Sequence, residues 1–141
     1  MNAPLYNTQI LRLAASVPID QRLSDPMGSV EKRSPACGSR VTVDVDLDSE
    51  GRIAALGMLV RACALGQASS ALMHAHAIGR TPAELATVRD QLAAYLAGEG
   101  GAPDWPGLEI FERALPHRGR HASIRLAFEA AAEAAAQAEA R

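Results

Sequence analysis

The residues from 40 to 48 alternate between apolar and polar side chains, and this alternation constrains the fold more than any other stretch. The apolar positions are Val41, Val43, Val45 and Leu47. The positions between them hold Thr42, Asp44, Asp46 and Asp48. Side chains on a β-strand point to opposite faces with a period of two, so the pattern predicts a strand with one buried and one solvated face. We interpret the acidic row as the solvated face, with a cation site as the alternative.

A second strand is expected from Arg52 to Val60, and Asp48 to Gly51 form the turn between the two strands. In an antiparallel hairpin, the numbers of facing residues add to a constant. Cys37 and Cys63 are the only thiols, and their midpoint lies inside this turn. Pairing of the two strands should therefore bring both thiols to one end of the sheet.

Helical periodicity or helix-start signals occur in five further segments. They are Leu5 to Ala15, Ala64 to Ile78, Thr81 to Leu96, Gly107 to Leu115, and the stretch that begins near Arg118. A short edge strand fits Gly28 to Arg33. The alanine-rich end of the last helix, from about Ala132, offers little to pack and is expected to fray. Together these segments predict one α+β domain over residues 1–141, with a small antiparallel sheet of about three strands covered by helices.

Composition excludes several classes of partner. The chain has 14 basic and 16 acidic residues and only one Trp, two Tyr and two Phe, so no basic or aromatic surface for nucleic acid is expected. The apolar runs are too short to cross a membrane, and the N-terminus does not read as a signal peptide. We therefore expect a cytoplasmic protein whose cysteines stay reduced, which favours metal or thiol chemistry over a disulfide.

The two cysteines lie in different settings. Cys63 falls where the second strand meets the buried helix, and the free N–H groups at a helix N-terminus stabilise a thiolate. Cys37 lies in a Pro35 to Gly38 turn that presents its thiol on a loop. The alternative for Cys63 is a small buried apolar residue.

His121 is the histidine that best fits a metal site. It shares the inward stripe of the last helix with Ile124 and lies in the first turn, where the helix dipole disfavours imidazolium. A neutral ring can bind a metal. His74 and His76 are two apart on a helix and point to different faces, so they cannot chelate one ion together. Two thiolates and one imidazole suit Zn²⁺ or an iron–sulfur species.

Four segments, in this order, resemble the U-type iron–sulfur cluster assembly scaffolds, the NifU N-terminal, IscU and SufU-like family. They are Pro35-Ala36-Cys37-Gly38-Ser39-Arg40-Val41, Arg61-Ala62-Cys63-Ala64-Leu65-Gly66-Gln67-Ala68-Ser69-Ser70, Gly79-Arg80-Thr81 with Glu84-Leu85, and Arg118-Gly119-Arg120-His121-Ala122-Ser123-Ile124. They are similar to the family's PxCGD, GCxxxxASS, GKT-xEE(A/L) and RxKCA(T/S)L segments.

The ligand set departs from the family pattern. Ser39 stands where the family has an aspartate, and His121 stands at the third cysteine. In an alternative, IscU-like alignment, His121 matches the family's histidine and Ala122 its cysteine. In both alignments the third thiol is absent and His121 is the ligand-type residue that remains.

The resemblance implies a SufE/NifU-like fold and a non-enzymatic scaffold or carrier that binds iron, zinc or an iron–sulfur cluster. Its ligands would be Cys37, Cys63 and His121, with Ser39 as a further candidate. The implied partners are a cysteine desulfurase or other sulfur-donor protein and apo iron–sulfur acceptor proteins. Two alternatives stay open: a zinc-poised thiol that accepts sulfur, as in sulfurtransferases, and a degenerate metal-free interaction domain.

Overall fold

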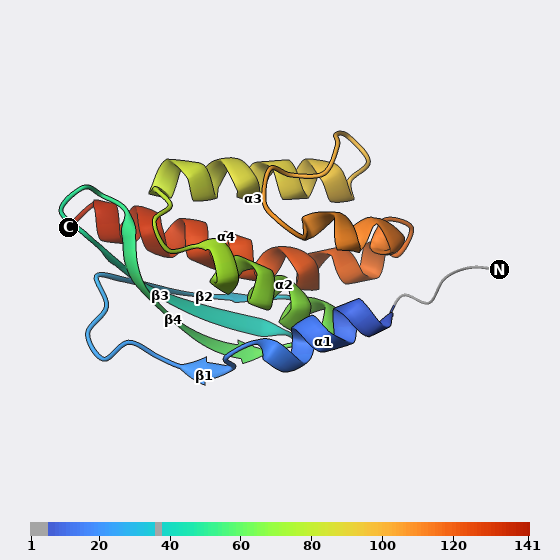
Figure 1. Ribbon diagram of the computed structural model, residues 1–141, viewed down its shortest axis with the longest axis horizontal. Coiled ribbons are helices and arrows are strands. Elements are labelled where there is room, and N and C mark those ends of the chain that lie inside the picture. Colours follow the sequence, from blue (N-terminus) through green and yellow to red (C-terminus); the bar gives the residue numbers. More distant parts are fainter. Residues whose placement is uncertain (1–5, 36–37) are drawn as a thin grey trace.

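The computed structural model describes residues 6–35 and 38–141, which form an antiparallel sheet with helices on one side (Figure 1). The strands are β1 (Asp20–Gln21), β2 (Gly28–Arg33), β3 (Arg40–Leu47) and β4 (Ile53–Arg61), in the order β1-β4-β3-β2. The helices are α1 (Thr8–Ser16), α2 (Ala64–His76), α3 (Pro82–Leu96) and α4 (His121–Glu139), with 3-10 turns η1 (Leu108–Ala114) and η2 (Arg118–Arg120). The predicted α+β class is confirmed. The fourth strand, β1, escaped prediction because two residues cannot show a period of two.

The helices form two layers on the sheet. In Figure 1, α4 lies between the sheet and α3, and α2 lies beside α4. The core side of the sheet is completely buried at Val41, Val43 and Val45, as the alternation predicts. Within residues 6–35 and 38–141, no helix combines the length and apolar character that crossing a membrane requires.

The hairpin of β3 and β4 forms as predicted, with its register displaced by one residue. Arg40 pairs with Arg61 and Asp46 with Ala55, so the numbers of facing residues add to 101 along most of the ladder. A bulge between Asp46 and Leu47 shifts the register near the turn, where Leu47 pairs with Ile53. The predicted constant of 100 therefore holds only beside the turn, because one extra residue, Ala54, enters β4 at the bulge.

The prediction that the acidic row faces solvent is wrong at Asp44, which is 0% exposed. The chain that follows β1 crosses this face of the sheet and covers it. Leu23 N donates to Asp44 Oδ2 at 3.0 Å, and Arg22 binds both carboxylate oxygens. Gly57 of β4 pairs with Asp44, and its lack of a side chain leaves room for this segment. A Cβ at Gly57 would lie only 2.6 Å from Leu23 N. Alternation with a period of two indicates which face of the sheet a side chain points to, but it does not indicate which segment of the chain covers that face.

The prediction that the alanine-rich end of α4 offers little to pack is also wrong. Ala134 and Ala138 are buried against β2, where a Cβ on Gly28 would collide with the backbone of both. Lys32 forms an ion pair with Glu133 at 2.8 Å, which ties the same half of the helix to the strand. Small side chains here allow the helix backbone to approach the sheet closely, so α4 continues to Glu139.

Candidate metal centre

Three elements meet at the end of the sheet opposite the β3–β4 turn: the connection from β2 to β3, the start of α2 and the start of α4 (Figure 1). The connection is closed by Ser34 N donating to Ser39 O at 2.8 Å and by Gly38 N donating to Ser34 O at 2.9 Å. Gly38 has φ +74°, a conformation that glycine adopts without strain. Cys37 itself lies outside the described residues, so its predicted role stays a prediction.

Cys63 lies where it was predicted, between β4 and α2. It is the N-cap residue of α2, is half-buried and has a free thiol that makes no capping hydrogen bond. Its carbonyl accepts from Gln67 N at 2.9 Å, the first hydrogen bond of the helix. The remaining N–H groups of the first turn carry partial positive charge beside this sulfur.

Ser69 fixes the start of α4 against α2. Its Oγ donates to the carbonyl of Ile124 at 2.6 Å, and both groups are buried. Gly66, in the first turn of α2, lets the two helices approach: a Cβ there would lie 3.3 Å from the carbonyl oxygen of Ser123. The first turns of α2 and α4 are therefore held side by side.

Ser123 lies at the candidate site and was not predicted from the sequence. It is 1% exposed, and its Oγ lies 3.4 Å from Ser39 Oγ, which is also buried. A signal was present: Ser123, Ala127 and Ala131 are spaced by four, so Ser123 shares the buried ridge of α4. The residue of α4 that meets the β2–β3 connection is thus Ser123.

His121 occupies the opposite face of the helix. It is buried, and its Nε2 lies 2.9 Å from the carbonyl oxygen of Ala114. A carbonyl only accepts hydrogen bonds, so Nε2 carries the hydrogen and Nδ1 is the nitrogen left for a further contact. Residues two apart on a helix differ by about 200° in direction. The structure therefore brings Ser123, and not His121, against Ser39, and a ligand role for His121 stays a prediction.

No group of three or more histidine, cysteine, aspartate or glutamate side chains that could hold a metal ion occurs among the described residues. His74 and His76 are near the far end of α2, and the His76 ring packs edge-on against Trp105 with centroids 6.3 Å apart.

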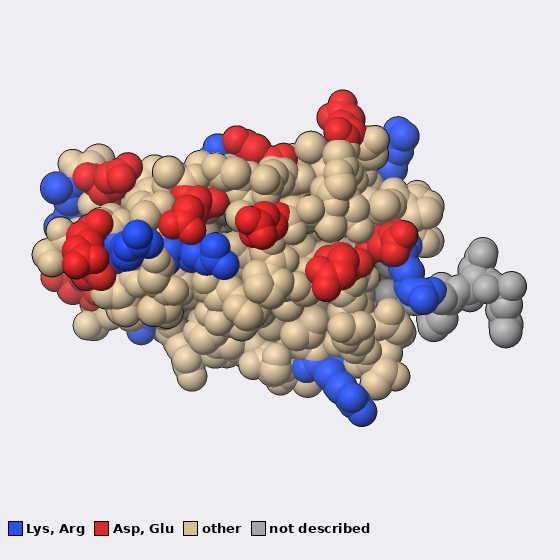
Figure 2. Space-filling model, turned by 45° about the horizontal axis from the view of Figure 1, so that its top comes forward, with Lys and Arg blue, Asp and Glu red and all other residues tan. Residues whose placement is uncertain are grey.

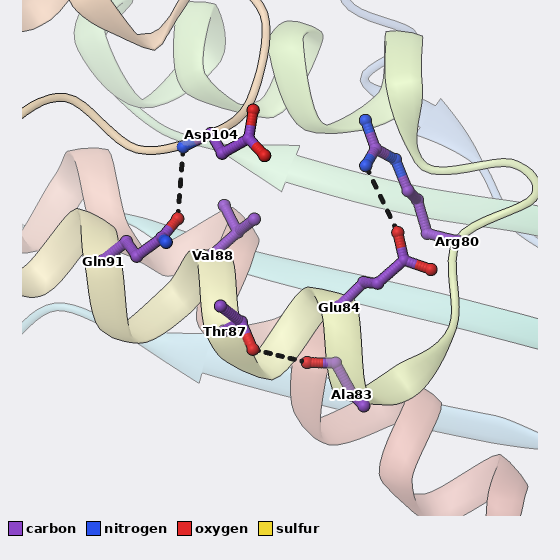
Figure 3. Close-up of a pocket in the computed structure, with 7 residues that line it drawn as sticks. All are labelled: Arg80, Ala83, Glu84, Thr87, Val88, Gln91 and Asp104. Carbon is purple, nitrogen blue, oxygen red and sulfur yellow. Dashed lines mark hydrogen bonds and ion pairs between the residues drawn. The ribbon is translucent and has the colours of Figure 1, made fainter.

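A groove of about 230 Å³ along α3 offers polar groups away from the thiol site (Figure 3). Its lining residues are Arg80, Ala83, Glu84, Thr87, Val88, Gln91 and Asp104. Arg80 contacts Glu84 at 3.3 Å and lies over the Trp105 ring at 4.6 Å. Gln91 Oε1 accepts from Asp104 N at 3.1 Å. These contacts anchor the loop after α3, and we assign the groove a structural role.

No family model and no curated protein matches the chain. The N-terminal part of a nitrogen-fixing NifU-like protein from Brucella abortus is 35% identical, with a TM-score of 0.88 over 97% of this chain and 96% of that one. A putative iron–sulfur cluster assembly scaffold protein for the SUF system, from the thermophile Fervidobacterium islandicum AW-1, is 19% identical, with a TM-score of 0.84 over 93% and 96%. At 19% identity the second match shows a shared fold.

Proposed function

The chain belongs to the NifU-like family of iron–sulfur cluster assembly scaffold proteins, and we propose that it carries an iron–sulfur cluster, or its iron, at the thiol end of the sheet. One observation supports this location most directly. Cys63, with its half-buried thiol, is the N-cap residue of α2 and lies where the β2–β3 connection and the start of α4 meet. Cargo bound there would be close to solvent and within reach of a partner protein.

We propose Cys37 and Cys63 as the thiolate ligands, because thiolates are the ligands that iron–sulfur clusters and zinc share. For the third position, His121 stays proposed through Nδ1, since its Nε2–H is oriented by a carbonyl as in many metal-bound histidines. Ser123 with Ser39 is the competing pair, favoured by their position against α2. Both proposed ligand sets carry less negative charge than three thiolates and an aspartate. We therefore expect them to bind the cluster or its iron less tightly.

The role is that of a carrier and not of a catalyst. Its proposed partners are a cysteine desulfurase or another sulfur-donor protein, and apo proteins that receive the cluster, all in the cytoplasm. A zinc-poised sulfur acceptor is the second candidate, supported by the position of Cys63 at a helix N-terminus. In that case the thiolate of one cysteine would attack the outer sulfur of a persulfide on the donor protein. This step would form a persulfide on this chain and release the donor's cysteine as a thiol, while zinc would be bound by the remaining ligands.

Anaerobic reconstitution with ferrous iron and sulfide tests the main proposal. We expect the wild-type chain to gain the visible absorption of a cluster, and the Cys37→Ala and Cys63→Ala variants to lose it. Ser70→Ala serves as the matched control, because Ser70 Oγ donates to Gly66 O within α2 and forms no hydrogen bond with a described residue of the proposed site. A wild-type chain that binds neither iron nor zinc would leave only the metal-free interaction domain. Zinc without a chromophore, together with fast alkylation of one thiol, would favour the sulfur acceptor.

A further inference from the structure

Three arginines form a row across three neighbouring strands at the thiol end of the sheet. Arg33 of β2 pairs with Arg40 of β3, and Arg40 pairs with Arg61 of β4. Facing residues of antiparallel strands extend to the same side of a sheet, so all three side chains share one face. Val41, the neighbour of Arg40, is completely buried under the helices, and alternation therefore puts the row on the helix-free face.

The row of arginines destabilises the sheet, and its exposed side chains are available to a partner. Like charges that face each other across strands destabilise a sheet. Arg33 is paired with Glu31 at 3.2 Å, whereas Arg40 and Arg61 form no ion pair with any described residue. All three residues are exposed. On the side turned forward in Figure 2, by contrast, acidic and basic side chains are dispersed over a largely uncharged surface.

The row borders a hollow of about 500 Å³ beside the connection from β2 to β3. The hollow is lined by Arg33, Ser34, Pro35, Gly38, Arg40 and Arg61. Ser34 is 2% exposed, and its Oγ has no hydrogen-bond partner among the described residues. A buried hydroxyl without a partner is uncommon in a folded protein, and it is explained if a bound group completes it. Arginine forks and a hydroxyl together match the acceptor geometry of carboxylates.

We propose that the Arg33–Arg40–Arg61 row docks an acidic segment of a partner protein, whose aspartate or glutamate side chains enter the hollow. This inference rests on the proposed function, because Arg61 precedes Cys63 by two residues and a protein docked here would lie beside the thiol site. A protein partner fits better than a nucleic acid. The chain as a whole carries a net charge of −2, which repels a polyanion at long range while a local row still pairs with a short acidic segment.

Fluorescence anisotropy with a labelled deca-glutamate peptide tests the row directly. At about 20 mM salt, where screening is weak, we expect the wild-type chain to bind the peptide, with affinity falling steeply toward physiological salt. Arg40→Glu and Arg61→Glu should each weaken binding about ten-fold or more, because each places a carboxylate against the peptide. Arg12→Glu makes the same change in charge at an exposed arginine of α1 and should change affinity less than about two-fold.

Equal losses in Arg40→Glu and Arg12→Glu, or no binding at low salt, would overturn the proposal. A single-stranded DNA 20-mer that binds more tightly than the peptide, and that depends on Arg40, would overturn the choice of a protein partner. The arginines are not among the proposed ligands, so cluster reconstitution should succeed in Arg40→Glu. A variant that loses the peptide but keeps the cluster supports the docking row, and a chain that binds the peptide but no cluster refutes only the proposed function.

Discussion

Arg22 holds the carboxylate of Asp44 beneath the sheet, with Nε 2.7 Å from Oδ2 and a second guanidinium nitrogen 3.0 Å from Oδ1. The Asp44 side chain is 0% exposed, whereas that of Arg22 is 42% exposed. Ser29 Oγ and Leu23 N donate to the same carboxylate. One aspartate in the middle of β3 therefore fastens the chain that follows β1 across the helix-free face.

The Asp44 clamp should make stability depend on pH in the acid range. Burial raises the pKa of Asp44, but hydrogen bonds from Arg22, Ser29 and Leu23 outweigh it, so its pKa in the folded chain lies below the ordinary value. This contribution is complete above the unfolded pKa of about 3.9 and is lost as pH falls through the lower folded pKa. Chemical denaturation should show wild-type stability falling below about pH 4. Asp44→Asn should flatten that dependence.

Asp44→Asn should also cost about 2–4 kcal/mol at neutral pH, since it removes the charge from a buried, multiply bonded acceptor. Asp25→Asn, at an exposed position after β1, is the matched control and should stay within about 0.5 kcal/mol. If the two variants unfold at the same denaturant concentration, the clamp contributes nothing to stability.

Gly28 should tolerate no side chain. A Cβ there would overlap the carbonyl oxygen of Ala134 and approach Ala138 N at 2.9 Å, and a helix backbone cannot move aside as a side chain can. We expect Gly28→Ala to lower the free energy of unfolding by about 2 kcal/mol or more through overpacking. Gly101→Ala, where a Cβ would meet nothing within 4 Å, should be close to neutral. Thermal unfolding of both variants measures the difference.

His121 should contribute to stability whether or not it binds a metal. Its ring is the donor to the carbonyl of Ala114, and both residues are buried. His121→Ala should lower the free energy of unfolding of the metal-free chain by about 1–3 kcal/mol, because the carbonyl loses its partner. His117→Ala, the same change at an exposed histidine, is the control. A ligand role predicts one more effect, a lower zinc or iron content in His121→Ala at temperatures where the variant is folded.

Elements set by contacts between near neighbours in sequence were predicted correctly, whereas features set by contacts between remote segments were not. The β3–β4 hairpin and the helix expected over Thr81 to Leu96 follow from patterns within a few residues, and both are confirmed. The burial of Asp44 and the packing of the alanine-rich end were predicted wrongly. Each depends on a segment remote in sequence, the chain after β1 in one case and β2 in the other. Periodicity carries no information about such contacts.

At the candidate site, too, local features could be predicted from the sequence and features set by remote contacts could not. The cap position of Cys63 is readable from the change of period at the strand–helix junction. The residue of α4 that faces Ser39 cannot be read from the sequence, because a shift of one or two positions changes the direction of a side chain by 100° to 200° around the helix. Motif alignment left His121 and Ala122 as the candidates for the lost third thiol. The packing of α4 on α2 through Ser69 and Gly66 turns Ser123 toward Ser39 instead.

Restoring a thiol on α4 should therefore work best at position 123. Ser123→Cys would place a sulfur where Ser123 Oγ now lies, 3.4 Å from Ser39 Oγ and beside the first turn of α2. With Cys37 and Cys63 it would supply a third thiolate, and we expect zinc affinity to rise about ten-fold or more in competition with a chromophoric chelator. Ala122→Cys adds the same thiol one residue away, about 100° around the helix, and should leave zinc affinity near that of the wild type. A stronger gain in Ala122→Cys would show that α4 presents a different face to the thiols.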